Sequence, residues 1–303
     1  FCAVKPALKA HLFILGANII YGINYAIGKV ALEHIEPFGI VLLRVSGALI
    51  IFTILAFLTG HEKIEKGDHK KLLIASLFGV VINQLMFFKG LSLTSEIHSA
   101  MIMIATPIIV LIMAWVILKD KITWVKSLGI LIGGIGVAML ISSGAVDEHS
   151  PSSLAGDICI TINATSYAVF LIIAKPLMLK YSPYTIARWI FTYGILFVLP
   201  FGWKEVDAIS WSSIPAIAIW ALVYVIIGAT VLAYLFNILG LNYGSPTLVS
   251  IYIYTQPVIA TIIAVAYGSD HLTIGKVVSA ILVFSGVALV SFTGAKKPLS
   301  SGV

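Results

Sequence analysis

The sequence predicts an all-α integral membrane protein with ten transmembrane helices, arranged as two inverted repeats of five helices. Two observations lead to this prediction. Apolar residues make up 60% of the 303-residue chain and charged residues 11%, with a mean hydropathy of +1.06, whereas soluble domains carry about a quarter charged residues. In addition, a pattern of glycine, serine, proline and lysine returns with a period of 150 residues.

The repeated pattern runs from Phe87 to Ala138 and returns without a gap. The corresponding pairs include Gly90 and Gly240, Ser95 and Ser245, Pro107 and Pro257, Asp120 and Asp270, and Lys126 and Lys276. A fixed period of this kind indicates a duplicated unit, which decides the architecture. The sequence therefore predicts a first repeat over 1–143, a second over 153–294 and a tail over 295–303.

Crossing the hydrocarbon layer takes about 20 mostly apolar residues. By this measure the expected spans are 11–31, 37–59, 71–91, 96–118, 123–143, 153–175, 183–202, 213–239, 246–267 and 273–294. Lysine and arginine gather at the N-terminal end, in alternate loops such as 60–71 and 119–126, and in the tail. Because basic loops stay inside, both termini are predicted to be cytoplasmic. The odd number of spans per repeat then inverts the second repeat, as in alternating-access carriers with a midplane substrate site.

The repeated motif resembles the EamA-type repeat of the drug/metabolite transporter superfamily. In each copy, Gly-Leu-x₃-Ser is followed by a proline, an acidic residue thirteen positions later and a Gly-rich helix, which is 129–138 in the first copy. The second helix of each half also begins with a Pro-then-Arg pair: Pro37 with Arg44, and Pro183 with Arg188. This sequence has Asp120 and Asp270 where the family usually has glutamate. The resemblance implies ten helices and export of small metabolites, often amino acids, by a bacterial inner-membrane protein.

Polar and aromatic side chains recur on single faces of several predicted spans. Tyr21 and Asn24 share one face of the first span, and Asn163 and Tyr167 share the matching face of the sixth. Such a face either packs helices together or lines a cavity; the symmetry favours the cavity. The residues predicted to bind substrate are Tyr21, Asn24, Gln84, Phe87, Asn163, Tyr167, Tyr234, Asn237, Tyr252 and Gln256.

Two arginines and two prolines lie inside predicted spans. Arg44 and Arg188 are expected to reach the headgroups of their own membrane faces, and the alternative is that they bind a substrate carboxylate or phosphate. Pro107 and Pro257 break the fourth and ninth spans, because proline frees a carbonyl of the previous turn. Each break is either a static kink or a hinge, and its occurrence in both repeats favours hinges.

The leading hypothesis is a secondary transporter that exports small metabolites, with amino acids as the best guess, and the alternative is a lipid or lipid-linked headgroup flippase. No Asp or Glu falls deep within a span, so exchange or uniport is expected rather than carboxylate-based proton coupling. GxSxG, HExxH and P-loop motifs are absent from the sequence, which predicts no enzyme activity, metal or cofactor. The expected partners are the substrate and membrane lipids but not nucleic acid, and the expected state is a monomer or weak dimer.

Overall fold

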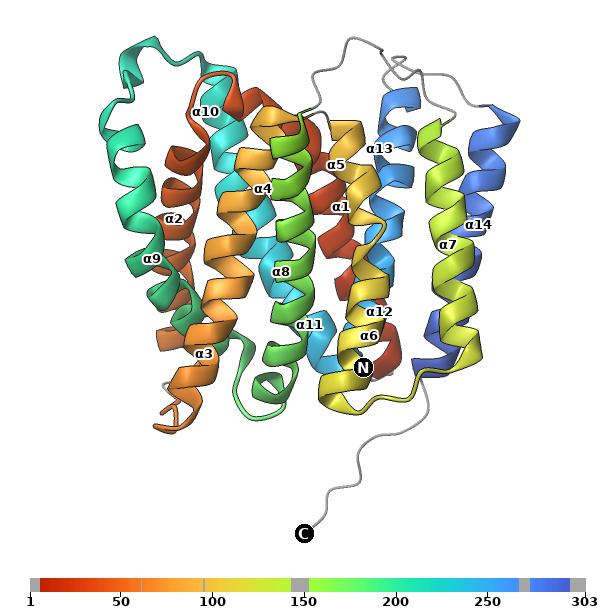
Figure 1. Ribbon diagram of the computed structural model, residues 1–303. Helices are drawn as coiled ribbons and strands as arrows, with labels where there is room; N and C mark the ends of the chain where they lie inside the picture. The colour runs from red at the N-terminus through yellow and green to blue at the C-terminus, as the bar shows by residue number, and fades with distance from the viewer. Residues whose placement is uncertain (1–5, 61, 95, 143–152, 267–272, 295–303) are drawn as a thin grey trace.

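The computed structural model describes residues 6–60, 62–94, 96–142, 153–266 and 273–294. In this part the chain is an antiparallel bundle of long helices, with α2 and α9 at one edge and α7 and α14 at the other (Figure 1). Helix α1 begins and α14 ends at the lower end in the view of Figure 1, which is called the lower end below. The predicted tail 295–303 and Asp270 lie outside the described residues.

The first half of the chain forms eight helical segments. They are α1 (Pro6–Leu32), α2 (Pro37–Leu58), α3 (Asp68–Ser76), the π-helical η1 (Leu77–Val81), α4 (Ile82–Leu93), α5 (Glu96–Met103), α6 (Thr106–Leu118) and α7 (Trp124–Ser142). Segments α3, η1 and α4 run on as one helix, Asp68–Leu93. The helix expected over 96–118 is instead divided into α5 and α6.

The second half repeats this order of helices. Its segments are α8 (Leu154–Met178), α9 (Pro183–Asp207), the 3₁₀ turn η2 (Trp211–Ser213), α10 (Ala216–Val223), the π-helical η3 (Tyr224–Leu232), α11 (Ala233–Tyr243), α12 (Pro246–Ile251), the 3₁₀ turn η4 (Tyr252–Tyr254), α13 (Thr255–Ala266) and α14 (Ile274–Gly294). Segments α10, η3 and α11 are continuous, as are α12, η4 and most of α13.

Nine helices in the described residues are long and apolar enough to cross a membrane, and Thr106–Leu118 is a shorter apolar helix. Large apolar side chains such as Ile50, Trp115 and Phe284 are about half exposed on the outside of the bundle, which is typical of a surface that faces lipid. The chain is therefore a multi-pass membrane protein, and the expectation of an all-helical membrane fold is confirmed.

Local sequence explains where several helices begin. Pro37 and Pro183 occupy the first turns of α2 and α9, where a missing backbone N–H costs nothing. Ser153 and Ser245 cap α8 and α12, because each side chain accepts a hydrogen bond from a backbone N–H three residues later. These signals keep the turns between helices short.

The breaks at Pro107 and Pro257 lie where proline predicts them. Helix α5 stops before a two-residue turn at Ile104–Ala105, and the 3₁₀ turn η4 precedes Pro257. The Tyr254 hydroxyl donates a hydrogen bond of 2.9 Å to the Ile104 carbonyl oxygen at the first break. A backbone group freed in a membrane helix needs such a partner, so one broken helix satisfies the other.

Matching contacts occur at corresponding positions of the two halves. The Lys29 ammonium donates to the Leu91 carbonyl oxygen, and the Lys175 ammonium donates to the Leu241 carbonyl oxygen, each over 2.7 Å. Helix α1 packs on α11, and α8 packs on α4 in the same manner. Each half thus supplies its first helix to the third helix of the other half.

Candidate functional site

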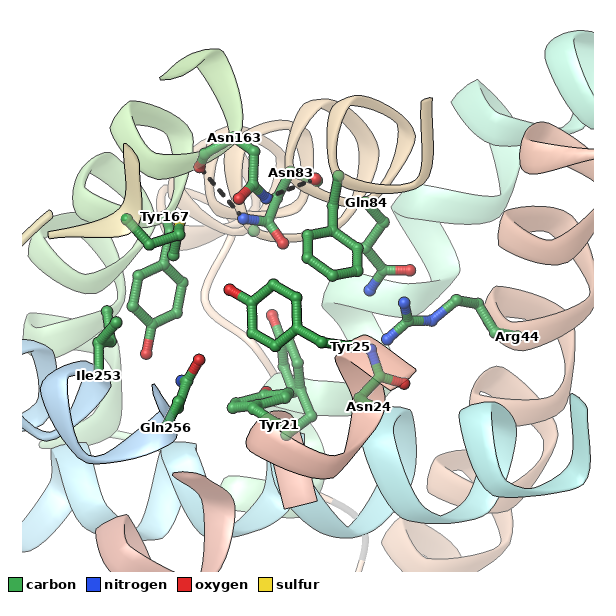
Figure 2. Close-up of a pocket in the computed structure, with 14 residues that line it drawn as sticks. Tyr21, Asn24, Tyr25, Arg44, Asn83, Gln84, Asn163, Tyr167, Ile253 and Gln256 are labelled. Carbon is green, nitrogen blue, oxygen red and sulfur yellow. Dashed lines mark hydrogen bonds between the residues drawn. The ribbon is translucent and has the colours of Figure 1, made fainter. Parts of the chain in front are cut away.

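A pocket lies in the middle of the bundle, between helices of both halves (Figure 2). It has a volume of about 90 Å³. The lining residues are Tyr21, Asn24, Tyr25, Arg44, Gly79, Asn83, Gln84, Phe87, Met103, Asn163, Tyr167, Tyr234, Ile253 and Gln256. They come from α1, α2, η1, α4, α5, α8, α11, η4 and α13, so the pocket is surrounded by helices.

Arg44 supplies the positive charge of this pocket. Its side chain comes from α2 and is only 6% exposed. The Arg44 Nε donates to Thr230 Oγ1 over 2.7 Å, Nη2 lies 3.4 Å from the Ala229 carbonyl oxygen, and the guanidinium carbon lies 5.1 Å from the centre of the Phe88 ring. The expectation that Arg44 extends to the headgroups is wrong, because α2 packs on η3 and turns the side chain inward.

The partners of Arg44 carry no net charge. In the described part of the chain the recorded ion pairs involve Asp68 and Glu65, and none includes Arg44. Thr230 is itself anchored, because its hydroxyl donates to the Val225 carbonyl oxygen over 2.6 Å within the π-helical η3. The π-helical turn therefore presents one hydroxyl to the guanidinium, and η1 and η3 both lie beside the pocket, as π-bulges often do at functional sites.

Two amide side chains flank Arg44 in Figure 2. Asn24 Oδ1 and Gln84 Oε1 are buried and have no hydrogen-bond partner among the described residues, and neither has the Tyr234 hydroxyl. An unpaired buried oxygen costs about 1–3 kcal/mol. Such groups in a cavity are therefore typical of a site that a ligand completes.

The wall opposite Arg44 is hydrogen-bonded. Asn163 Nδ2 donates to the Asn83 carbonyl oxygen over 2.8 Å, and Asn83 Nδ2 lies 3.4 Å from the Asn163 carbonyl oxygen, so the two residues join α4 to α8. Asn237 Nδ2 donates to the Tyr167 hydroxyl over 2.6 Å. Gln256 Nε2 donates to Asn18 Oδ1 over 2.7 Å and fixes one end of the pocket.

The structure brings most of the predicted site residues together. Those at the pocket are Tyr21, Asn24, Arg44, Gln84, Phe87, Asn163, Tyr167, Tyr234 and Gln256. Asn237 lies behind Tyr167, and the Tyr252 hydroxyl instead bonds His11 Nδ1 at 2.7 Å. Arg188 is also outside the lining and stacks on Phe57.

Sequence reasoning missed Tyr25, Asn83, Met103 and Ile253, which also line the pocket. Tyr25 lies four residues after Tyr21, so the helical face drawn through Tyr21 could have included it. Asn83 was missed because η1 precedes it, and a π-helical turn shifts the phase of the face.

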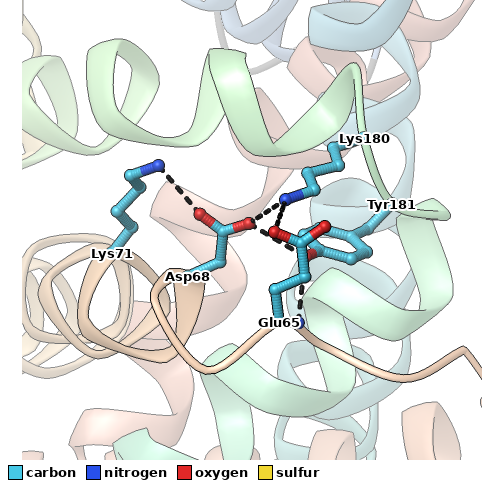
Figure 3. Close-up of polar contacts among 5 residues, drawn as sticks. All are labelled: Glu65, Asp68, Lys71, Lys180 and Tyr181. Carbon is cyan, nitrogen blue, oxygen red and sulfur yellow. Dashed lines mark hydrogen bonds and ion pairs between the residues drawn. The ribbon is translucent and has the colours of Figure 1, made fainter.

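A second polar cluster lies at the lower end, away from the pocket (Figure 3). The Asp68 carboxylate is 5% exposed and accepts hydrogen bonds from Lys71 Nζ (2.8 Å), Lys180 Nζ (2.7 Å) and the Tyr181 hydroxyl (2.9 Å). Hydrogen bonds to Asp68 and then to Glu65 raise the pKa of Lys180 above its ordinary value. The cluster ties the start of α3 to the turn between α8 and α9.

Comparison with known proteins agrees with this geometry. The chain is 26% identical over 288 residues to the "Uncharacterized transporter YyaM" of Bacillus subtilis (strain 168), covering 94% of both chains. It is 22% identical to an "Uncharacterized transporter" of Archaeoglobus fulgidus, covering 93% of this chain and 96% of that one. The "WAT1-related protein At3g53210" of Arabidopsis thaliana is 23% identical, with 95% and 86% covered.

A solved structure titled "Crystal structure of protein" superposes with a TM-score of 0.73 at 16% identity, covering 94% of this chain and 97% of that one, and so has the same fold. The model of the EamA-like transporter family matches twice, over residues 8–142 and 154–292. Both this match and the relatives named as transporters indicate transport rather than enzyme catalysis. The helical membrane fold and the two matches together show that the chain belongs to the EamA-like transporter family of the drug/metabolite transporter superfamily.

Proposed function

We propose that this protein is a secondary transporter of small amphipathic metabolites, with amino acids as the preferred class, and that it works by alternating access between its two repeats. One observation carries the proposal: Arg44 lies in the central pocket with neutral partners, beside two buried amide oxygens without a partner. The positive charge and the free acceptors are complementary to a molecule with both an anionic group and a hydrogen-bond donor.

A zwitterion satisfies both requirements at once. A carboxylate can pair with the Arg44 guanidinium through two parallel hydrogen bonds. The ammonium group of the same molecule can donate to Asn24 Oδ1 and Gln84 Oε1, which lie on either side of Arg44 in Figure 2. The rings of Tyr21 and Phe87 would then face the remainder of the substrate.

The charge of the pocket also argues against nucleotide sugars. Arg44 is the one cationic side chain among the lining residues of the described chain. A diphosphate carries at least two negative charges, and burying a charge without a partner costs several kcal/mol. A single carboxylate is therefore the better match.

The enclosure of the pocket favours a soluble metabolite over the alternative, a lipid headgroup. The lining residues come from both halves of the chain and from most of its long helices. A flippase needs a polar groove open sideways, so that acyl chains stay in the bilayer while the headgroup crosses. Helices on all sides would block those chains.

The buried charge of Arg44 favours exchange over uniport. With the substrate gone, changing between the two open states keeps an uncompensated guanidinium in an apolar interior, which costs several kcal/mol. A bound carboxylate removes this cost. We therefore expect the loaded protein to change state faster than the empty one, so that counterflow exceeds net flux.

The alternating-access part of the proposal rests on the symmetry of the fold. The proposed protein has ten spans in two inverted repeats, which the matching contacts of Lys29 and Lys175 support. The breaks before Pro107 and Pro257 are the proposed hinges, because helix halves on either side can tilt separately. The proposed location is the bacterial inner membrane with both termini cytoplasmic and net flux outward, in keeping with the basic lower loops.

Counterflow in proteoliposomes tests this function. Vesicles are preloaded with a mixture of unlabelled amino acids, and labelled amino acids are added outside one at a time. The expected result is transient accumulation of one label, abolished in the double variant Asn24→Ala/Tyr167→Ala but kept in Lys204→Gln, which changes an exposed cation outside the pocket. Absence of accumulation with every amino acid, from protein of normal thermal stability, would contradict the proposed substrate class.

A further inference from the structure

An aromatic and cationic cluster lies on the outer edge of the bundle at the lower end, where α2 ends and α3 and α9 begin (Figure 1). Its centre is Arg188, which is half-buried. The guanidinium carbon of Arg188 lies 4.8 Å from the centre of the Phe57 ring and 5.7 Å from that of the Trp189 ring. Phe57 is 61% exposed, so the cluster faces outward rather than into the central pocket.

The ring of Trp189 is held in place by two neighbouring side chains. The His69 ring meets Trp189 edge-on, with centroids 4.9 Å apart and an interplanar angle of 80°. His69 Nδ1 lies 2.7 Å from the Tyr193 hydroxyl, which fixes the His69 ring in turn. The position of Arg188 is therefore set by residues from α2, α3 and α9, and does not depend on one flexible side chain.

The depth of the cluster matches the level of lipid headgroups. Arg188 follows Pro183, the first residue of α9, by five residues, and at 1.5 Å per residue this is about 7–8 Å from the helix end. Long basic side chains at such depths extend to the interface, and tryptophan is enriched there. Phe57 is the second-last residue of α2, so Arg188 points toward the membrane surface.

We propose that Arg188, framed by Phe57 and Trp189, binds the phosphate of an anionic phospholipid in the leaflet at the lower end. The planar guanidinium can form two hydrogen bonds to a phosphate, and stacking on aromatic rings leaves it pre-oriented and poorly hydrated. The exposed side chains of Lys70 and Lys71 at the same end add positive potential, which favours an anionic headgroup over a zwitterionic one.

The surface next to Arg188 accommodates an acyl chain. Ile50, Ile54 and Phe57 are 61%, 53% and 61% exposed and follow one another at spacings of four and three residues. They therefore form an apolar stripe along one face of α2 that leads away from Arg188 into the bilayer. A phosphate with an attached apolar chain fits this combination, whereas a soluble anion would use only the charged end. The site is separate from the transport pocket and does not rest on the proposed substrate.

Fluorescence quenching of the full chain tests the site. The protein is held in a neutral detergent with phosphatidylcholine, and brominated phosphatidylglycerol is added stepwise. Subtracting the signal of Trp189→Phe isolates the quenching of Trp189 from that of the other tryptophans. The expected result is saturable quenching that unbrominated phosphatidylglycerol competes away and that brominated phosphatidylcholine does not reproduce.

Substitutions then assign the binding to Arg188. In Arg188→Ala the half-saturating lipid concentration should rise about tenfold or more, the size expected for losing charged hydrogen bonds. Arg188→Lys should lie between that variant and the unchanged protein, and it serves alone if Arg188→Ala does not fold. The matched control Lys70→Ala removes an exposed cation at the same end and should shift the concentration less than about twofold.

Three results would overturn the proposal. Equal quenching by brominated phosphatidylcholine would show ordinary annular lipid. An unchanged half-saturating concentration in both Arg188→Ala and Arg188→Lys would remove Arg188 from the site. Competition by inorganic phosphate at the same concentration would assign the cluster to soluble anions instead of a lipid.

Discussion

Replacing Arg44 with glutamine separates charge from shape at the centre of the pocket. Glutamine can still bond to Thr230 but offers a substrate carboxylate no positive charge. A hydrogen bond to a charged group contributes about 1.5–3 kcal/mol, and Arg44 has no ionic partner in the described residues that would take its place. Arg44→Gln should therefore raise the half-saturating substrate concentration about 10- to 150-fold.

The assay is initial counterflow rate against external substrate, in proteoliposomes, for whichever amino acid the unchanged protein accumulates. Arg44→Lys keeps the charge but loses the two-pronged contact, so its half-saturating concentration should lie between the two. Thr230→Val removes the hydroxyl that holds the Arg44 Nε and should cost about 2- to 10-fold, the net value of one neutral hydrogen bond.

The same variant also tests the argument about exchange. Removing the buried charge lowers the cost of changing state without substrate, so in Arg44→Gln the ratio of counterflow to net flux should fall toward one. An unchanged half-saturating concentration, with thermal stability preserved, would refute the assignment of the carboxylate to Arg44. A lost affinity with an unchanged flux ratio would refute only the charge argument for exchange.

Three further predictions concern stability, measured as the midpoint of thermal unfolding in detergent. Gly286→Ala should lower it by several degrees, because the new Cβ would lie 2.5 Å from the Gly129 carbonyl oxygen; Gly67→Ala, which meets nothing within 4 Å, is the control and should change it little. Tyr254→Phe should also lower the midpoint, because the buried Ile104 carbonyl loses its donor at a cost of about 1–3 kcal/mol, and equal midpoints would show that another group replaces it. Asp68→Asn should destabilise more at low than at high salt, since it removes the partner of Lys180. The raised pKa of Lys180 means that this contribution is complete below the unfolded value of 10.5 and is lost only as pH rises through the folded value; a midpoint shift in Asp68→Asn that is independent of salt would contradict it.

The sequence by itself determined the class of the protein and the ends of its helices. Its hydropathy and the lengths of its apolar runs fixed a helical membrane fold, because a chain in lipid must satisfy its backbone within each helix. Pro107 and Pro257 marked the breaks in the same way, since proline lacks the N–H that a helix needs. These are local properties, and one sequence is enough to read them.

Only the tertiary structure decided which polar faces meet. Arg44 and Arg188 follow corresponding prolines in the sequence, yet one is buried against η3 and the other stacks on Phe57 at the outer edge. Asn83 lies at the pocket because the π-helical η1 rotates the helix that carries it. The physical reason is that packing between helices and changes of helical phase depend on neighbours more than 100 residues away, which no spacing within one helix encodes.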